Sequence, residues 1–199
     1  MTHRKLQIST IAILFLNIYG CATPDSAVYG KFEGKDPRQI TREYAERNAG
    51  TGKSFVLIGA GDIAACDHPV SSRAQNTANV IINDYPDALV FTAGDNVYTR
   101  YRVGNVTRDT YEKCYGPSWG KFRDRTLPAP GNHDEGISLY ENLVPYFEYF
   151  GRNAANSDTP GLGYYSADLG SWHIISLNSE EIERHPDGDQ AKKQYEWLR

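Results

Sequence analysis

Three short apolar runs of the sequence each end close to a glycine that is followed directly by Asp or Asn. The runs lie at 55–58, 88–91 and 127–130, and the polar residues after them are Asp62, Asp95 and Asn132. Successive runs are spaced by close to one βαβ unit, which takes about 30 residues or more. The carboxyl ends of neighbouring parallel strands meet at one edge of a sheet. The pattern therefore predicts an α/β fold in which these three residues face a common site.

The other apolar patterns predict the elements around that sheet. The expected elements are a helix over 72–84, a core helix over 139–150 that Pro145 bends or divides, a β-hairpin of 164–169 and 172–177, and an amphipathic helix over 190–199. A content of 40% hydrophobic and 23% charged residues is that of a globular chain. The composition thus agrees with a packed domain and excludes a wholly disordered one.

The first twenty residues have the pattern of a secretory signal. A basic stretch, His3-Arg4-Lys5, precedes an apolar run at 8–19. This run is too short for a bilayer-spanning helix, which needs about 20 residues. It ends at Gly20-Cys21, which resembles the cleavage box of bacterial lipoproteins with Cys21 as the lipid-modified residue, although Tyr19 departs from that box. We expect an exported protein held by a lipid anchor in the cell envelope; the alternatives are a plain signal peptide cleaved near Ala22, which gives a secreted or periplasmic protein, and a buried N-terminal helix.

The chain is accordingly divided into a signal peptide at 1–20, a tether at 21–53 and the folded domain at 54–199. The tether assignment depends on scattered Pro and Gly residues and on a charged stretch at 38–47. One polar helix is compatible with that stretch. The division predicts that the core is built from residues after position 53.

Charge and cysteine content narrow the partners and the compartment. The 25 acidic and 21 basic residues give a formal net charge of −4, so no nucleic acid is expected as a partner. The three cysteines are Cys21, Cys66 and Cys114. If Cys21 carries lipid, the other two remain as a pair in an oxidising compartment, which predicts a Cys66–Cys114 disulfide. Two separate buried thiols are the alternative.

The residues at the strand ends have the chemistry of a metal site. Neighbouring strands lie about 4.8 Å apart, so carboxylates at their ends can reach two metal ions about 3.5 to 4 Å apart. Asp62, Asp95, Asn132 and nearby Tyr98 supply oxygen atoms, which are ligands for hard cations. The alternative is three ordinary glycine turns, because Asp and Asn are common turn residues.

The same positions resemble a known family. The motifs that carry the likeness are Gly61-Asp62, Gly94-Asp95-Asn96-Val97-Tyr98 and Gly131-Asn132-His133-Asp134. In this order they resemble the signatures of the calcineurin-like metallophosphoesterases, over about residues 54–199. Tyr98 makes the chain most similar to the purple acid phosphatase branch, and Ala64 stands where many other members have a histidine. The resemblance implies an α/β fold that forms part of a four-layer αββα sandwich.

The resemblance also implies a role for each motif residue. Asp62 and Tyr98 would bind a first metal, Asp95 would bridge both metals, and Asn132 would bind the second. His133 would approach the phosphoryl oxygen or the leaving group as a catalytic residue. The implied cofactors are two metal ions, Fe³⁺ with Fe²⁺, Zn²⁺ or Mn²⁺, and the implied substrate is a small phosphate ester.

Family members have further histidines that the sequence lacks. They carry a later histidine and a G-H-x-H loop, whereas the histidines here are His3, His68, His133, His173 and His185. We therefore expect a C-terminally truncated enzyme, with His68, His173 and His185 on loops or the surface. The alternative function is a non-catalytic, lipid-anchored envelope binding protein on the same fold. A nuclease would need a cationic groove, which the acidic balance disfavours.

Overall fold

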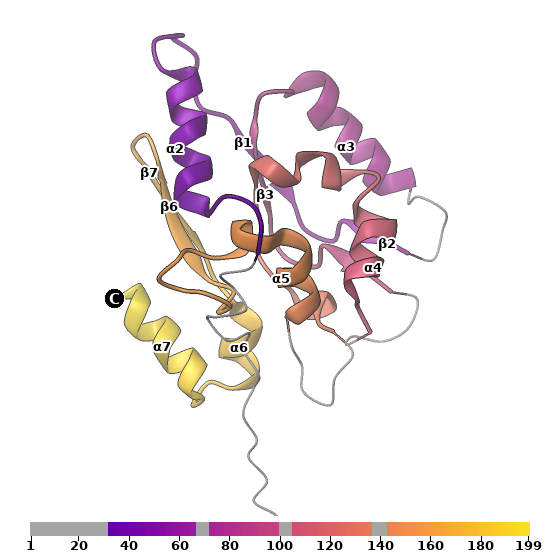
Figure 1. Ribbon diagram of the computed structural model, residues 1–199, viewed down its shortest axis with the longest axis vertical. Coiled ribbons are helices and arrows are strands. Elements are labelled where there is room, and N and C mark those ends of the chain that lie inside the picture. The colour runs from indigo at the N-terminus through magenta and orange to yellow at the C-terminus, as the bar shows by residue number, and fades with distance from the viewer. Residues whose placement is uncertain (1–31, 67–71, 100–104, 137–142) are drawn as a thin grey trace, which may run out of the picture.

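The computed structural model describes residues 32–66, 72–99, 105–136 and 143–199 (Figure 1). The signal peptide, Cys21 and His68 lie outside the described residues. Within the described part, no helix is long and apolar enough to cross a membrane. The fold is mixed α/β with parallel strand pairing, as the strand and turn pattern predicted.

A three-stranded parallel sheet forms the centre of the fold. It contains β1 (Leu57–Ala60), β3 (Leu89–Thr92) and β5 (Thr126–Leu127), with β3 in the middle. Helix α3 (Ser72–Asp84) connects β1 to β3 and has the bounds that the periodicity predicted. Its buried residues recur at helical spacing: Ala74, Ala78 and Ile81. Strand β1 begins two residues after the start of its predicted apolar run, β3 begins one residue after, and β5 begins one residue before.

Both faces of this sheet are covered, which is normal for parallel strands. Successive residues of β3 enter different clusters, because side chains alternate along a strand. Val90 packs with the cluster that includes α3, whereas Leu89 packs on the opposite side with Leu127 of β5. The second cluster also contains residues from the helix at 37–48 and from the hairpin that follows residue 164: Ile40, Tyr44, Tyr165 and Leu169.

Helix α2 (Pro37–Asn48) corrects the tether assignment for residues 32–53. Asp36 caps the helix by accepting a hydrogen bond from the Gln39 amide (2.9 Å), and Pro37 occupies the first turn. Ile40 and Tyr44 are buried one turn apart. The Tyr44 hydroxyl accepts from the Val56 amide at 3.0 Å. The expected polar helix exists, but it packs beside the hairpin as part of the folded unit (Figure 1).

The expected hairpin is confirmed. Strands β6 (Tyr165–Leu169) and β7 (Trp172–Ser176) pair antiparallel, and Gly170 turns between them with a φ of 61°. Helix α6 (Ser179–Arg184) follows, and α7 (Asp189–Leu198) forms where the last amphipathic pattern begins. Gln194 of α7 is buried and bonds both the amide (2.8 Å) and the carbonyl (2.9 Å) of Asn178, which attaches α7 to the turn before α6.

The segment between β3 and β6 is made of short elements. They are β4 (Val97–Tyr98), α4 (Arg108–Thr110), the π-helix η1 (Tyr111–Tyr115), the 3-10 helices η2 (Trp119–Arg125), η3 (Asn132–Asp134) and η4 (Gly151–Ala154), and α5 (Val144–Phe150). Strand β4 pairs in parallel with β2 (Ala64–Ala65). The expected bend or division at Pro145 is not observed in α5. Pro145 lies in the first turn, where its missing N–H breaks no helical hydrogen bond. Leu139 lies outside the described residues.

Candidate metal centre

Asp62 and Asp95 occupy equivalent places beyond the carboxyl ends of β1 and β3. Both have a left-handed backbone, with φ values of 53° and 50°. Asp and Asn tolerate this conformation better than most residues, but it still costs roughly 1 kcal/mol or more. The two turns are joined directly, since the Ile63 amide donates to the Asp95 carbonyl (3.0 Å). Left-handed residues that persist at matching strand ends are typical of functional sites.

Tyr98 brings the two carboxylates together. Its hydroxyl lies within hydrogen-bonding distance of Asp62 Oδ1 and, at 2.7 Å, of Asp95 Oδ2. The pairing of β4 with β2 places the Tyr98 backbone beside Ala65, three residues after Asp62. Burial, followed by the two carboxylates, raises the pKa of Tyr98 well above its usual value. A phenol has a single proton, so three oxygen atoms here share one donor.

The turn at 131–134 packs closely against Asp95. The His133 amide donates to Asp95 Oδ1 (3.0 Å), and the His133 ring lies 4.3 Å from the Tyr98 ring between centroids. A Cβ on Gly131 would come within 2.4 Å of both the Asp95 amide nitrogen and Oδ1. Glycine is required here by space, because no real Cβ approaches a neighbour so closely. Asn132 is half-buried directly before His133.

Asp134 is a site residue whose role the sequence pattern did not reveal. It is fully buried and accepts hydrogen bonds from four groups. Burial raises the pKa of Asp134 to about 7, while the bonds from Tyr111, Gly131 and Asn96 act in the opposite direction. The one signal in the sequence was its place as the last residue of the third motif.

Cys66 and Cys114 form a disulfide, which is the pairing expected from the cysteine content. Their Cα atoms are 5.2 Å apart. The Cys66 amide donates to the Tyr98 carbonyl (2.9 Å). The disulfide therefore connects the strand pair that positions Tyr98 to the π-helix η1, which carries both Tyr111 and Cys114.

The converging residues fit a hard cation. Among the described residues, no cluster of three or more His, Cys, Asp or Glu side chains could hold a metal ion. The oxygen set here instead combines the carboxylates of Asp62 and Asp95 with the Tyr98 phenol, and Asn132 lies in the neighbouring turn. Carboxylate, phenolate and amide oxygens suit hard metal ions, and a cation is the charge that two neighbouring carboxylates favour.

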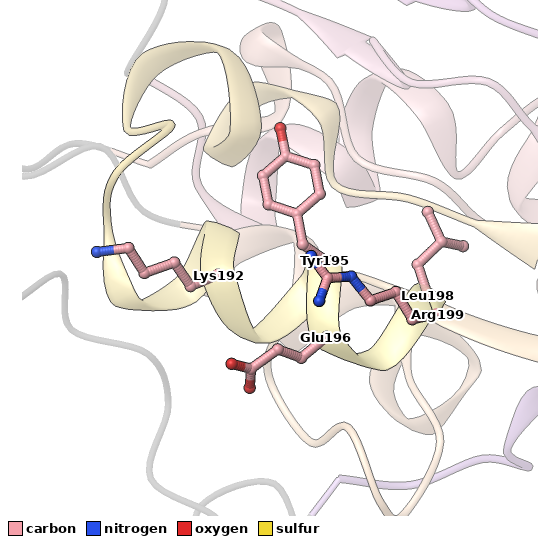
Figure 2. Close-up of a pocket in the computed structure, with 5 residues that line it drawn as sticks. All are labelled: Lys192, Tyr195, Glu196, Leu198 and Arg199. Carbon is pink, nitrogen blue, oxygen red and sulfur yellow. The ribbon is translucent and has the colours of Figure 1, made fainter.

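The other described histidines lie on the surface. His173 pairs with Asp168 (2.6 Å) on the solvent-facing side of the hairpin, and His185 is exposed after α6. A hollow of about 430 Å³ on α7 is lined by exposed side chains that include Lys192, Tyr195 and Glu196 (Figure 2). It contains none of the residues of the strand-end site.

Comparisons with known proteins add no identification. No protein-family model, no curated protein and no solved structure matches the chain.

Proposed function

We propose that this chain belongs to an exported protein and contributes residues to a dinuclear metallophosphoesterase site, similar to that of purple acid phosphatases. The observation that carries the proposal is the convergence of Asp62, Asp95 and Tyr98 oxygens at the ends of parallel strands. Three motifs that are separate in the sequence meet there. A turn-only interpretation explains each motif alone, but it does not require a phenol to lie between two carboxylates.

The residues divide the work of metal binding by position. Asp62 and Tyr98 would hold the first ion, Asp95 would bridge, and Asn132 would hold the second. Bound Fe³⁺ with Fe²⁺, Zn²⁺ or Mn²⁺ would supply an activated water and charge stabilisation for phosphate ester hydrolysis. The hydrogen bond from the His133 amide to Asp95 and the close fit of Gly131 against Asp95 hold the ligand-bearing turns together.

His133 is suited to act on the substrate. Its amide is bonded to Asp95 and its ring lies against Tyr98, so the imidazole is held beside the oxygen set. In that place it would stabilise negative charge on a phosphoryl oxygen or give a proton to the leaving group. The substrate class is a small phosphate ester.

Two further parts of the proposal concern architecture and compartment. The cluster shared by β3, β5 and β6 supports two sheets packed face to face, which is the inner part of a four-layer αββα sandwich. The Cys66–Cys114 disulfide supports an oxidising compartment, in keeping with export and a lipid anchor at Cys21.

Metal binding and turnover test the function together. The ¹⁵N-labelled chain is titrated with Mn²⁺, and 4-nitrophenyl phosphate hydrolysis is measured on the same samples. We expect paramagnetic broadening centred on the amides of Asp62 and Asp95, and an affinity reduced about 100-fold in Asp95→Asn. Asp168→Asn is the matched control, because it changes an exposed carboxylate outside the site.

The outcomes separate the competing functions. Unchanged Mn²⁺ binding in Asp95→Asn contradicts the metal site. Localised binding supports the metal site whether or not hydrolysis is seen, because the further histidines of the family are missing from this sequence, and hydrolysis in addition favours the enzyme over the non-catalytic binding protein. With Fe³⁺, Tyr98 ligation predicts a visible tyrosinate charge-transfer band that Tyr98→Phe abolishes.

A further inference from the structure

A buried carboxylate joins the two loops that carry the proposed ligands. Asp134 Oδ1 accepts from the Asn96 amide (2.9 Å) and from the Tyr111 hydroxyl (2.7 Å). Asp134 Oδ2 accepts from the Asn96 side-chain amide (2.9 Å) and from the Gly131 amide (2.9 Å). An ionised carboxylate is an acceptor only, so the four donors match its capacity.

The bonding between the loops runs in both directions. Asp95, in the loop 94–98, accepts from the His133 amide in the loop 131–134 (3.0 Å). Asp134, in the loop 131–134, accepts from Asn96 in the loop 94–98. Each loop thus provides a carboxylate that accepts a hydrogen bond from a backbone amide of the other loop. These reciprocal hydrogen bonds fix the position of the loop 94–98 relative to the loop 131–134.

Tyr111 attaches this pair of loops to a third element. Its ring is fully buried, stacks on Tyr149 at 4.8 Å between centroids, and meets Phe150 edge-on. The Tyr111 hydroxyl therefore has little freedom to leave Asp134. The π-helix that carries it is also bound covalently through Cys114. Rigid support from such outer groups typically governs how well metal ligands are placed.

We propose that Asp134 and Tyr111 are positioning residues of the metal site. Neither residue belongs to the proposed ligand set, and together they hold Asp95 in its left-handed conformation opposite Asn132 and His133. The inference rests on the proposed function, since it assigns a task to residues behind the proposed ligands. It predicts that removing one buried hydroxyl, that of Tyr111, weakens metal binding without touching a ligand.

The test compares Tyr111→Phe with Tyr146→Phe in the full chain. Both substitutions remove one phenolic oxygen from a fully buried ring, but the Tyr146 hydroxyl donates to the Pro128 carbonyl (2.9 Å), outside both loops. We expect Mn²⁺ to bind about 10-fold more weakly to Tyr111→Phe and within about twofold of wild type to Tyr146→Phe. Asp134→Asn turns an acceptor into a donor, and we expect a loss of roughly 100-fold.

A second readout needs no metal. The His133 amide bonds to Asp95 and to neither substituted residue, so its hydrogen exchange reports whether the loops stay in register. We expect faster exchange of this amide in Tyr111→Phe than in Tyr146→Phe. Equal Mn²⁺ affinity and equal exchange in the two variants overturn the inference.

Failure of the proposed function would look different. A wild-type chain that shows no localised Mn²⁺ effect contradicts the metal site itself. In that case the exchange of the His133 amide alone decides whether Asp134 and Tyr111 hold the loops together. Faster exchange in Tyr111→Phe then shows that these residues hold the two loops together, and equal exchange overturns that role.

Discussion

The strand-end loops and the β6–β7 hairpin use their aspartates in opposite ways. In the loops, Asp134 is fully buried and accepts four hydrogen bonds. In the hairpin, Asp168 pairs with His173 while 80% of its side chain is exposed. Water can replace the partner of Asp168, but it cannot reach those of Asp134. The irregular loops are therefore more sensitive to the loss of a polar atom than the regular hairpin is.

The largest effect should come from the covalent link behind the loops. The disulfide joins residues 48 positions apart, and closing a loop of that length stabilises a fold by about 4 kcal/mol. The double substitution Cys66→Ser with Cys114→Ser should lower the free energy of urea unfolding by that amount. Wild-type protein measured in reductant is the control. A loss under about 1 kcal/mol would show that the loops do not depend on the link.

The second-largest effect is expected from replacing the buried Asp134, and replacing the exposed Asp168 provides the comparison. Asp134→Ala leaves four donors without their acceptor in the interior, so we expect the free energy of unfolding to fall by about 3 kcal/mol. Asp168→Ala should lower it by no more than about 0.5 kcal/mol, since its pair is exposed. Equal losses in urea unfolding would remove the distinction between loop and hairpin.

A smaller effect concerns the space beside Asp95. Gly131→Ala places a Cβ within 2.4 Å of Asp95, and we expect a loss of about 2 kcal/mol with a shifted His133 amide resonance. Gly61→Ala is the matched control at another strand end, where the nearest atom lies 3.2 Å away. Its expected loss is under about 1 kcal/mol. If both variants are equally stable, the loops are looser than the close contact indicates.

The smallest effect should occur in the hairpin. His173→Ala removes an exposed hydrogen bond to Asp168, and the free energy of unfolding should change by less than about 0.5 kcal/mol. Thermal unfolding followed by circular dichroism measures this change. A loss above about 1.5 kcal/mol would mean that the hairpin depends on its polar pair as the loops do.

Much of the fold could be predicted from local patterns. The period of Ala74, Ala78 and Ile81 predicted α3 with its observed bounds, and Gly170 marked the turn of the hairpin. The packing of helix α2 into the core was harder to predict. Two of its buried residues, Ile40 and Tyr44, lie in a charged stretch, and the buried residues with which they form a core cluster lie at position 89 and beyond. No local pattern contains those partners.

The candidate site divides in the same way. The glycine–aspartate and glycine–asparagine pairs predicted that Asp62, Asp95 and Asn132 would lie at strand ends. The support from Tyr111 could not be predicted, because its hydroxyl reaches Asp134 across 23 positions of sequence and through a short π-helix. A buried hydrogen bond of this kind depends on packing that brings both groups out of water.

The sequence by itself determined the strand order along the chain, the turns that end the strands, and the chemical types gathered there, because these depend on neighbouring residues and backbone preferences. Only the tertiary structure decided that Tyr98 lies between two carboxylates, that Asp134 is buried among four donors, and that α2 belongs to the core. Those features depend on distances between segments far apart in the chain, and burial and packing set such distances.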